Sequence, residues 1–394
     1  MRRKRLALVL LLAVFISTAA TGCWDRHEIN DISFVLAIGA DRTPPEPDYH
    51  FTQLIAVPRA LGGPAEGAGG AREKPYYLVK TRGAALSLVM GAITDFTPRI
   101  LFINHAKAMV LGEALARGGV EEALERALRC WQCRPTLEIL VARGRAEDVL
   151  GKADPRLEQF PSEAITGLLR KTEGPRLAFP VTLREFVMVL LAEGKDPVAP
   201  VLGTVSPYPP GGRRERQEEP PREELAITGM AVFRGAHLQG FLEGGTARGA
   251  MWVFGKMRDR YAFNPANGRP VTLMNVTSRG KLRPVINGER IIMNLEVEAS
   301  GILSDWPELK HRLEPQTIKF LEKYAAESIA GEIVDSLSLV QQQYRADIFG
   351  FGAAIERRDP SRWRSLKDRW YEVYPELETR VKVKVTIREP GSTR

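Results

Sequence analysis

Three cysteines, Cys23, Cys130 and Cys133, are the residues whose type and placement most clearly indicate chemistry. Cys23 follows four basic residues at positions 2–5, an apolar run at 6–16 and a short stretch of small residues. That order is typical of a secretory signal peptide, and an apolar run of about 11 residues is too short to span a bilayer, which takes roughly 20. We therefore expect residues 1–22 to be a signal peptide and the chain that follows to work outside the cytoplasm.

The residues just before Cys23 indicate that its thiol is modified. Ala20, Thr21 and Gly22 followed by Cys23 resemble a bacterial lipobox, in which small residues admit the lipoprotein peptidase and the thiol takes a diacylglyceryl group. Ala20 departs from leucine, the commonest lipobox residue at its position. The alternative is ordinary signal cleavage, which would leave an exposed lone thiol, a reactive group in an exported protein. We expect lipidation at Cys23 and stable anchoring by the attached acyl chains.

Cys130 and Cys133 form a C-x-x-C motif directly after an expected helix. A redox motif of this kind would follow a strand. A zinc site would need four ligands, and the chain has only five histidines and no second cysteine pair. The pattern therefore favours a third interpretation, a local disulfide or two buried thiols, although it leaves all three open.

Sequence motifs for catalysis or cofactor binding are missing. The chain has no G-x-S-x-G, no H-E-x-x-H and no glycine-rich loop ending in Lys-Ser or Lys-Thr. The net charge of +8 includes the basic residues at 2–5, so the remainder carries about +4, too little to indicate nucleic-acid binding. We expect no enzyme activity, no catalytic or metal-binding residue, no cofactor and no nucleic-acid partner.

Strands and helices alternate in residues 23–196, which predicts a mixed α/β sheet with helices packed against it. Thr182, with Glu185 three residues later, has the spacing of a capping box. The 394 residues and 44% hydrophobic content suit two or three globular domains. Hydrophobic periodicity predicts strands at 34–38, 49–57, 76–80, 106–111 and 137–141, and helices at 84–93, 120–129, 162–170 and 182–191.

Residues 197–223 differ sharply in composition from the segments on either side. They combine several prolines and glycines with a run of mixed charge, and their central part offers little that could build a core. We expect a solvated linker here, between an N-terminal region at 23–196 and a C-terminal domain at 224–394.

The C-terminal segment predicts an antiparallel sheet with a long helix across it, an α+β domain. Asn287-Gly288 tolerates positive φ at both positions and predicts a type I′ hairpin. The predicted strands lie at 225–233, 237–242, 281–286, 290–299 and 381–387, a helix or irregular segment at 244–257, the long helix at 315–345, and shorter helices at 353–358 and 362–371.

A basic and aromatic segment at 357–370 allows two interpretations. Its arginines, lysine and tryptophans could contact anionic lipid or an acidic partner. Alternatively, Trp363 and Trp370, seven residues apart, face the core of a surface helix. Acidic residues within the segment favour the second interpretation.

Short motifs spread over nearly the whole mature chain carry a resemblance to a known family. They are GCWDR at 22–26, EIND at 28–31, IGAD at 38–41, AKAMVLGE at 106–113, AVF at 231–233, GFL at 240–242 and ADIFGFG at 346–352, followed by Trp370 and the strand at 381–387. In these residues the chain resembles the Ger(x)C spore germination lipoproteins, the C subunits of nutrient germinant receptors in endospore-forming bacteria. The C-x-x-C motif is not a feature of that resemblance.

The resemblance implies a non-enzymatic, multidomain α/β lipoprotein on the outer face of the spore inner membrane, with two integral membrane subunits, A and B, as partners. Only Cys23 gains a chemical role from it. Asp347, Phe349, Gly350 and Gly352 belong to a run that we take as structural, with a contact to another subunit as a second option. The alternative function is a solute-binding lipoprotein of a transporter, which would have two similar lobes around a cleft.

Overall fold

A computed structural model describes most of the chain from residue 31 onward. The described residues are 31–42, 48–57, 74–85, 92–95, 97–152, 158–170, 177–205, 223–265, 270–305 and 314–388, with the single positions 2, 3, 5, 10, 11, 28 and 88. The expected lipobox residues Ala20, Thr21 and Gly22, and Cys23 itself, lie outside them.

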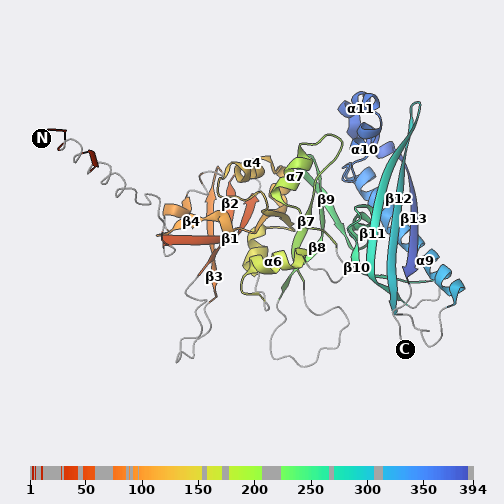
Figure 1. Cartoon of the computed structure of the whole chain (residues 1–394), viewed down its shortest axis with the longest axis horizontal. Coiled ribbons are helices and arrows are strands. Elements are labelled where there is room, and N and C mark those ends of the chain that lie inside the picture. The colour runs from red at the N-terminus through yellow and green to blue at the C-terminus, as the bar shows by residue number, and fades with distance from the viewer. Residues whose placement is uncertain are drawn as a thin grey trace.

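A large sheet and a small sheet occupy opposite ends of an elongated molecule (Figure 1). The large sheet has the strand order β3-β2-β1-β5-β6-β7-β8-β9, and β4 pairs with β1 outside this path. Its central strands are parallel and both edges are antiparallel, which confirms the mixed sheet. Its strands are β1 (Ile32–Arg42), β2 (Tyr49–Ala56), β3 (Tyr76–Gly83), β4 (Ile100–Phe102), β5 (Ala108–Gly112), β6 (Glu138–Ala142), β7 (Val198–Val205), β8 (Glu224–Arg234) and β9 (His237–Glu243).

Helices cover both faces of the large sheet. On one face, α3 (Glu113–Gly118), α4 (Glu121–Arg129) and α7 (Leu183–Leu190) pack into a core that includes Leu124 and Phe186. On the other, α5 (Ala146–Lys152) and α6 (Pro161–Arg170) contribute Leu150 and Ile165 to a second core. Burial on both faces explains why the parallel strands read as continuous apolar runs.

The local helix signals are partly confirmed. Thr182 and Glu185 form the expected capping box, each side chain accepting a hydrogen bond from the other residue's backbone N–H. The helix expected at 84–93 falls mainly outside the described residues, which hold the 3₁₀ turn η3 (Ala92–Asp95) there. A second 3₁₀ turn, η4 (Ile103–His105), follows β4.

The prediction of a linker is wrong for its first part, because residues 198–205 form β7. Ala199, Val201 and Leu202 are fully buried, and β7 joins β6 to β8 in the large sheet. Strands β8 and β9 therefore extend the large sheet and are not part of a separate C-terminal domain at 224–394. Within the expected linker, residues 206–222 lie outside the described part of the chain.

The small sheet has the order β10-β11-β12-β13. Its strands are β10 (Arg258–Phe263), β11 (Val271–Asn287), β12 (Arg290–Asp305) and β13 (Glu378–Arg388). The hairpin between β11 and β12 is confirmed, but its turn lies one residue later than expected: Asn287 pairs with Arg290, so Gly288 and Glu289 are the turn residues. Only Gly288, the first of them, has a positive φ, of 62°, which fits a type II′ turn rather than type I′. The final strand pairs parallel to β12, because the intervening helices return the chain to the same end of the sheet.

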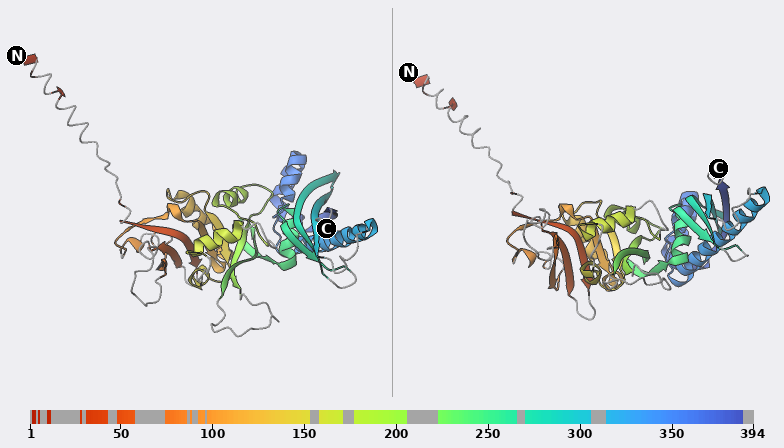
Figure 2. Two further views of the ribbon diagram at one scale, coloured as in Figure 1. Left: turned by 60° about the horizontal axis from the view of Figure 1, so that its bottom comes forward. Right: turned by 90° about the horizontal axis from the view of Figure 1, so that it is seen from below.

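The long helix α9 (Pro315–Ser338) lies against the small sheet and continues as a π-helical turn, η5 (Leu339–Gln343), so the expected regular helix ends earlier than residue 345. Figure 2 shows α9 beside this sheet in both views. Helix α8 (Gly244–Val253) follows β9, and α10 (Phe351–Arg358), α11 (Pro360–Leu366), η6 (Lys367–Arg369), α12 (Trp370–Val373) and η7 (Tyr374–Glu376) lead to β13. Trp363 and Trp370 are buried, which confirms their core interpretation.

Candidate functional site

The run containing Asp347, Phe349, Gly350 and Gly352 lies where the large-sheet unit meets the helices of the small-sheet unit. Asp347 is fully buried, both glycines are buried, and only Phe349 has a partly exposed side chain. These residues hold two parts of the same chain together, which gives them the structural role expected from the sequence. We call this region the junction.

The Asp347 carboxylate organises the start of α10. It accepts hydrogen bonds from the backbone N–H groups of Phe351 and Gly352, each at 2.8 Å. Gly350 precedes α10 in the left-handed conformation, with φ of 74°, which glycine adopts without steric cost. The turn therefore needs both the acid and the glycine at these positions.

Asp196, in the segment before β7, completes the polar core of the junction. The backbone N–H of Asp347 donates to Asp196 Oδ2 at 2.7 Å, and the N–H of Asp196 donates to the Asp347 carbonyl at 2.9 Å. Asp196 Oδ1 also accepts from the backbone N–H of Gly235 and from the Tyr371 hydroxyl. One side chain thus contacts the β8–β9 turn, the 347 turn and α12.

Burial dominates the electrostatics of this acid pair. It raises the pKa of Asp347 to about 7, and the nearby Asp196 carboxylate adds to the rise, while the backbone N–H groups oppose it. Burial also raises the pKa of Asp196. Two acids that are hydrogen-bonded to backbone groups in this way act as structural ties, because their lone pairs are already used.

Two glycines allow the backbones to meet. A Cβ on Gly352 would lie 2.6 Å from Gly194 Cα and 2.6 Å from the Trp363 ring. The Ala353 N–H donates to the Gly194 carbonyl at 2.9 Å across this contact. Any larger side chain at Gly352 would force the segment before β7 away from α10.

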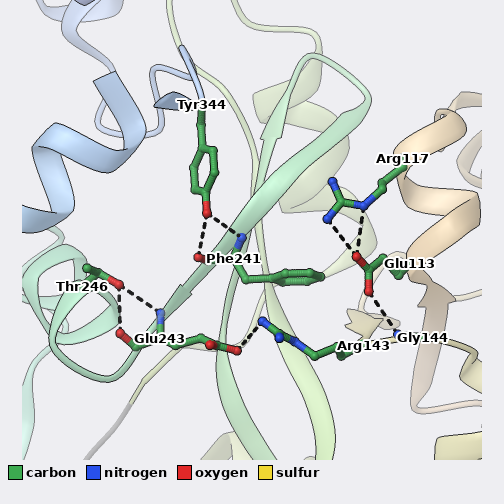
Figure 3. Close-up of polar contacts among 8 residues, drawn as sticks. All are labelled: Glu113, Arg117, Arg143, Gly144, Phe241, Glu243, Thr246 and Tyr344. Atoms are coloured by element: carbon green, nitrogen blue, oxygen red, sulfur yellow. Dashed lines mark hydrogen bonds and ion pairs between the residues drawn. The ribbon is translucent and has the colours of Figure 1, made fainter. Parts of the chain in front are cut away.

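A second set of contacts ties Tyr344, just after η5, to Phe241 in β9 (Figure 3). The Tyr344 hydroxyl donates to the Phe241 carbonyl at 3.0 Å and accepts from the Phe241 N–H at 3.2 Å. Gly240 makes room for this ring, because a Cβ there would overlap it. The GFL motif at 240–242 thus serves as the docking point of the C-terminal helices.

Charged side chains extend the same contact toward α3. The guanidinium groups of Arg143 and Arg117 lie over the Phe241 ring, 4.8 and 5.9 Å from its centre. Arg143 also pairs with Glu243 at 2.6 Å, and Arg117 pairs with Glu113. Phe241 is therefore held by hydrogen bonds on its backbone and by cations on its ring.

The junction also contains a cavity of about 310 Å³. Phe179, Phe186 and Phe254 form much of its apolar lining, and Lys195 and Lys256 are among its polar lining residues. Burial lowers the pKa of Lys195. The cavity lies between the large sheet and the 347 turn, so its shape depends on how the two units are held.

The C-x-x-C motif lies away from the junction, where α4 ends. Cys130 and Cys133 are free, half-buried thiols packed against the core of the large sheet. The Cys133 thiol donates to Cys130, which lowers the pKa of Cys130 to about 6 and raises that of Cys133. Two thiols are one form of the interpretation that the sequence favours, and a helix precedes them, as expected.

Two further properties concern the described residues as a whole. No group of three or more His, Cys, Asp or Glu side chains is placed to hold a metal ion in the described part of the chain. Over the same residues, no helix has both the length and the apolar composition needed to cross a bilayer.

Sequence reasoning identified the 347–352 run but missed Asp196, Tyr344 and Tyr371. Tyr344 falls within the range 315–345 that is predicted as one long helix, whereas in the structure it follows η5 and its hydroxyl hydrogen-bonds the backbone of Phe241. Asp196 follows Gly194-Lys195 in a segment that reads as a loop. The one sequence signal for Asp196 is that an acidic residue stands directly before the apolar residues 197–202, two of which are β-branched.

Comparisons with known proteins agree with this architecture. Residues 25–204 match the family described as "Spore germination protein N-terminal domain", and residues 228–391 match "Spore germination B3/ GerAC like, C-terminal". A putative spore germination protein, YfkR of Bacillus subtilis, is 28% identical over 97% of this chain and 96% of the YfkR chain. Spore germination protein KC of the same organism is 26% identical over 99% of this chain and 96% of the KC chain. The crystal structure of the GerBC protein shares the fold, with a TM-score of 0.55 and 17% identity over 92% of this chain and 99% of that one. The chain therefore belongs to the GerAC family of spore germination proteins.

Proposed function

We propose that this protein is the lipid-anchored C subunit of a spore nutrient germinant receptor, held at the outer face of the spore inner membrane through Cys23. It acts by contacts with two integral membrane subunits, A and B, and not by catalysis. Family membership carries the proposal. The signal segment and the small residues before Cys23 support the anchor.

The junction suits a protein that works through contacts. Asp196, Asp347 and Tyr344 tie the large-sheet unit to the small-sheet unit through buried or half-buried hydrogen bonds. A rigid connection lets a force or contact at one end of the elongated molecule reach the other end. Such coupling requires packed elements, which this region provides.

The alternative, a solute-binding lipoprotein, would have two similar lobes. The two units here differ: a nine-stranded mixed sheet covered on both faces, and a four-stranded sheet with a long helix against it. The junction cavity of about 310 Å³ has room for a small molecule, but it lies between unlike units. These observations favour the receptor subunit.

Affinity purification from sporulating cells tests the proposal. A tagged chain, extracted from membranes in mild detergent, should retain the A and B membrane subunits. The Cys23→Ala variant should lose tight membrane attachment, while a Cys133→Ala variant serves as the matched control and keeps it. Recovery of the tagged chain without either membrane subunit, at equal expression, would contradict the proposed role.

A further inference from the structure

The most exposed large apolar side chain in the described part of the chain is Trp131, at 84%. It occupies the turn between Cys130 and Cys133, at the end of α4. Leu128, one turn earlier, is 53% exposed. Exposed tryptophans are enriched at protein interfaces and at the membrane–water interface, because one part of the indole is apolar and the N–H is polar.

This turn is fixed next to the start of the folded chain. The Ile103 N–H donates to Gln132 Oε1 at 2.7 Å, which ties the turn to η4, just after β4. Strand β4 pairs with the first residues of β1, Ile32 opposite Ile100, and Ile100 is 46% exposed. In Figure 1, β4 and the start of β1 lie at the end of the molecule opposite the small sheet.

The length of chain before β1 limits how far this end can be from the anchor. Cys23 precedes Ile32 by nine residues, which span at most about 30 Å when fully extended. A lipid on Cys23 therefore keeps the β1–β4 end within reach of the bilayer surface. The small sheet, at the other end, is not restricted in this way.

Charge around Trp131 complements an anionic lipid surface. Helix α4 has Glu121 and Glu122 in its first turn and Arg126 and Arg129 in its last turn, just before Trp131; Arg129 pairs with Glu125, which leaves Arg126 as the cation of this turn that can face lipid. Arg134 directly follows Cys133, and Arg99 directly precedes Ile100 at the start of β4; both arginines are exposed. Arg126 lies at the cysteine pair, where it lines a small cavity with them. A tryptophan among arginines is the side-chain combination that favours the membrane interface.

We infer that the surface formed by Ile100, Leu128 and Trp131 with Arg99, Arg126 and Arg134 rests on the anionic bilayer in which the chain is anchored. We call it the Trp131 face. The inference rests on the proposed lipidation of Cys23 and adds an orientation to it: the large-sheet end is proximal to the membrane, and the small sheet projects away from it.

Tryptophan quenching by brominated lipids tests the orientation directly. The full lipoprotein is reconstituted into vesicles of phosphatidylglycerol and phosphatidylcholine that carry bromine at shallow acyl positions. The signal of Trp131 is the difference between the parent and Trp131→Phe. The matched control is Trp131→Phe with Val334→Trp, which places a tryptophan at an exposed position on α9, far from this end.

We expect the Trp131 difference signal to be quenched at least twofold more than that of the Trp at 334. Arg126→Glu with Arg134→Glu should lower the quenching in anionic vesicles but not in purely zwitterionic ones, whereas Arg279→Glu on β11 should change neither. Equal quenching of Trp131 and the control would overturn the inference. So would a Trp131 that becomes shielded from aqueous acrylamide only after A and B subunits are added, which would assign this face to a protein contact.

The results of the quenching and membrane-attachment experiments distinguish an error in this orientation from an error in the proposed lipidation of Cys23. If Cys23→Ala releases the chain from membranes while Trp131 of the parent is unquenched, lipidation stands and the Trp131 face is wrong. If Cys23→Ala stays attached as tightly as the parent, lipidation itself is wrong, whatever the quenching shows.

Discussion

Replacing Gly240 by alanine should destabilise the protein only while the Tyr344 ring is present. In the parent, an alanine Cβ would overlap that ring, and overpacking of this kind costs about 1–3 kcal/mol. Without the ring the same change should be neutral or stabilising by about 0.5–1 kcal/mol, because alanine loses less backbone entropy on folding than glycine. The double-mutant cycle of Gly240→Ala with Tyr344→Ala should therefore give a coupling energy of about 1–4 kcal/mol, the cost of the alanine with the ring minus its effect without the ring.

Urea denaturation of the four chains, followed by tryptophan fluorescence, measures this coupling. Tyr344→Phe is the matched control, because it keeps the ring and removes only the hydroxyl. Gly240→Ala should still be destabilising in that background. Tyr344→Phe should also speed hydrogen exchange at the Phe241 amide, which donates to the hydroxyl in the parent. An equal cost of Gly240→Ala with and without the ring would refute the docking of Tyr344 on β9.

Three further predictions concern the junction and the chain between the sheets. Gly352→Ala should lower the free energy of unfolding by about 1–3 kcal/mol, since the new Cβ would meet Gly194 and Trp363. The control Gly331→Ala in α9, where the new Cβ would meet open space, should raise the free energy of unfolding by about 0.5–1 kcal/mol. Thermal unfolding of both variants and the parent measures the two effects. The pKa of Asp347 is about 7 in the folded state and near 3.8 in the unfolded state. The stability that this group contributes is therefore fully present below about pH 4 and is lost as the pH rises through 7, by roughly 4 kcal/mol at most. Asp347→Asn should flatten this part of the curve of stability against pH, and a variant curve parallel to the parent's would contradict the prediction. Limited proteolysis should cut first within residues 206–222, on account of their Pro, Gly and Arg content, and a first cut inside β7 or α9 would count against this division.

Periodicity predicted most strands and helices because each of them buries one face or one stripe. It failed at β7, where Pro200 and the prolines that follow indicated a linker. Pro200 pairs in register with Met230 of β8, and it precedes the ladder to β6, which has only two residue pairs, Val141 with Val201 and Ala142 with Leu202. A missing N–H at Pro200 therefore removes no pair from the β6 ladder. A sequence shows the proline but not where the ladder to the neighbouring strand begins.

The candidate site was predictable only where it is local. The Asp347 cap on α10 joins residues four and five positions apart, so an acid before a glycine-rich turn was a usable signal. The contacts of Tyr344 with Phe241, and of Asp196 with Asp347, join residues 103 and 151 positions apart. Such pairs depend on how the two units dock, which periodicity does not encode.

The most direct test of the central claim is germination of spores that lack this chain. Deletion should abolish or slow germination on at least one nutrient, while sporulation, vegetative growth and the response to a non-nutrient trigger stay intact. The reason is that loss of a subunit that acts only through contacts removes a signal and not a metabolic step. Complementation with the parent gene should restore the response, and with Cys23→Ala it should not. An unchanged response to every nutrient, in a strain without redundant receptors, would contradict the account.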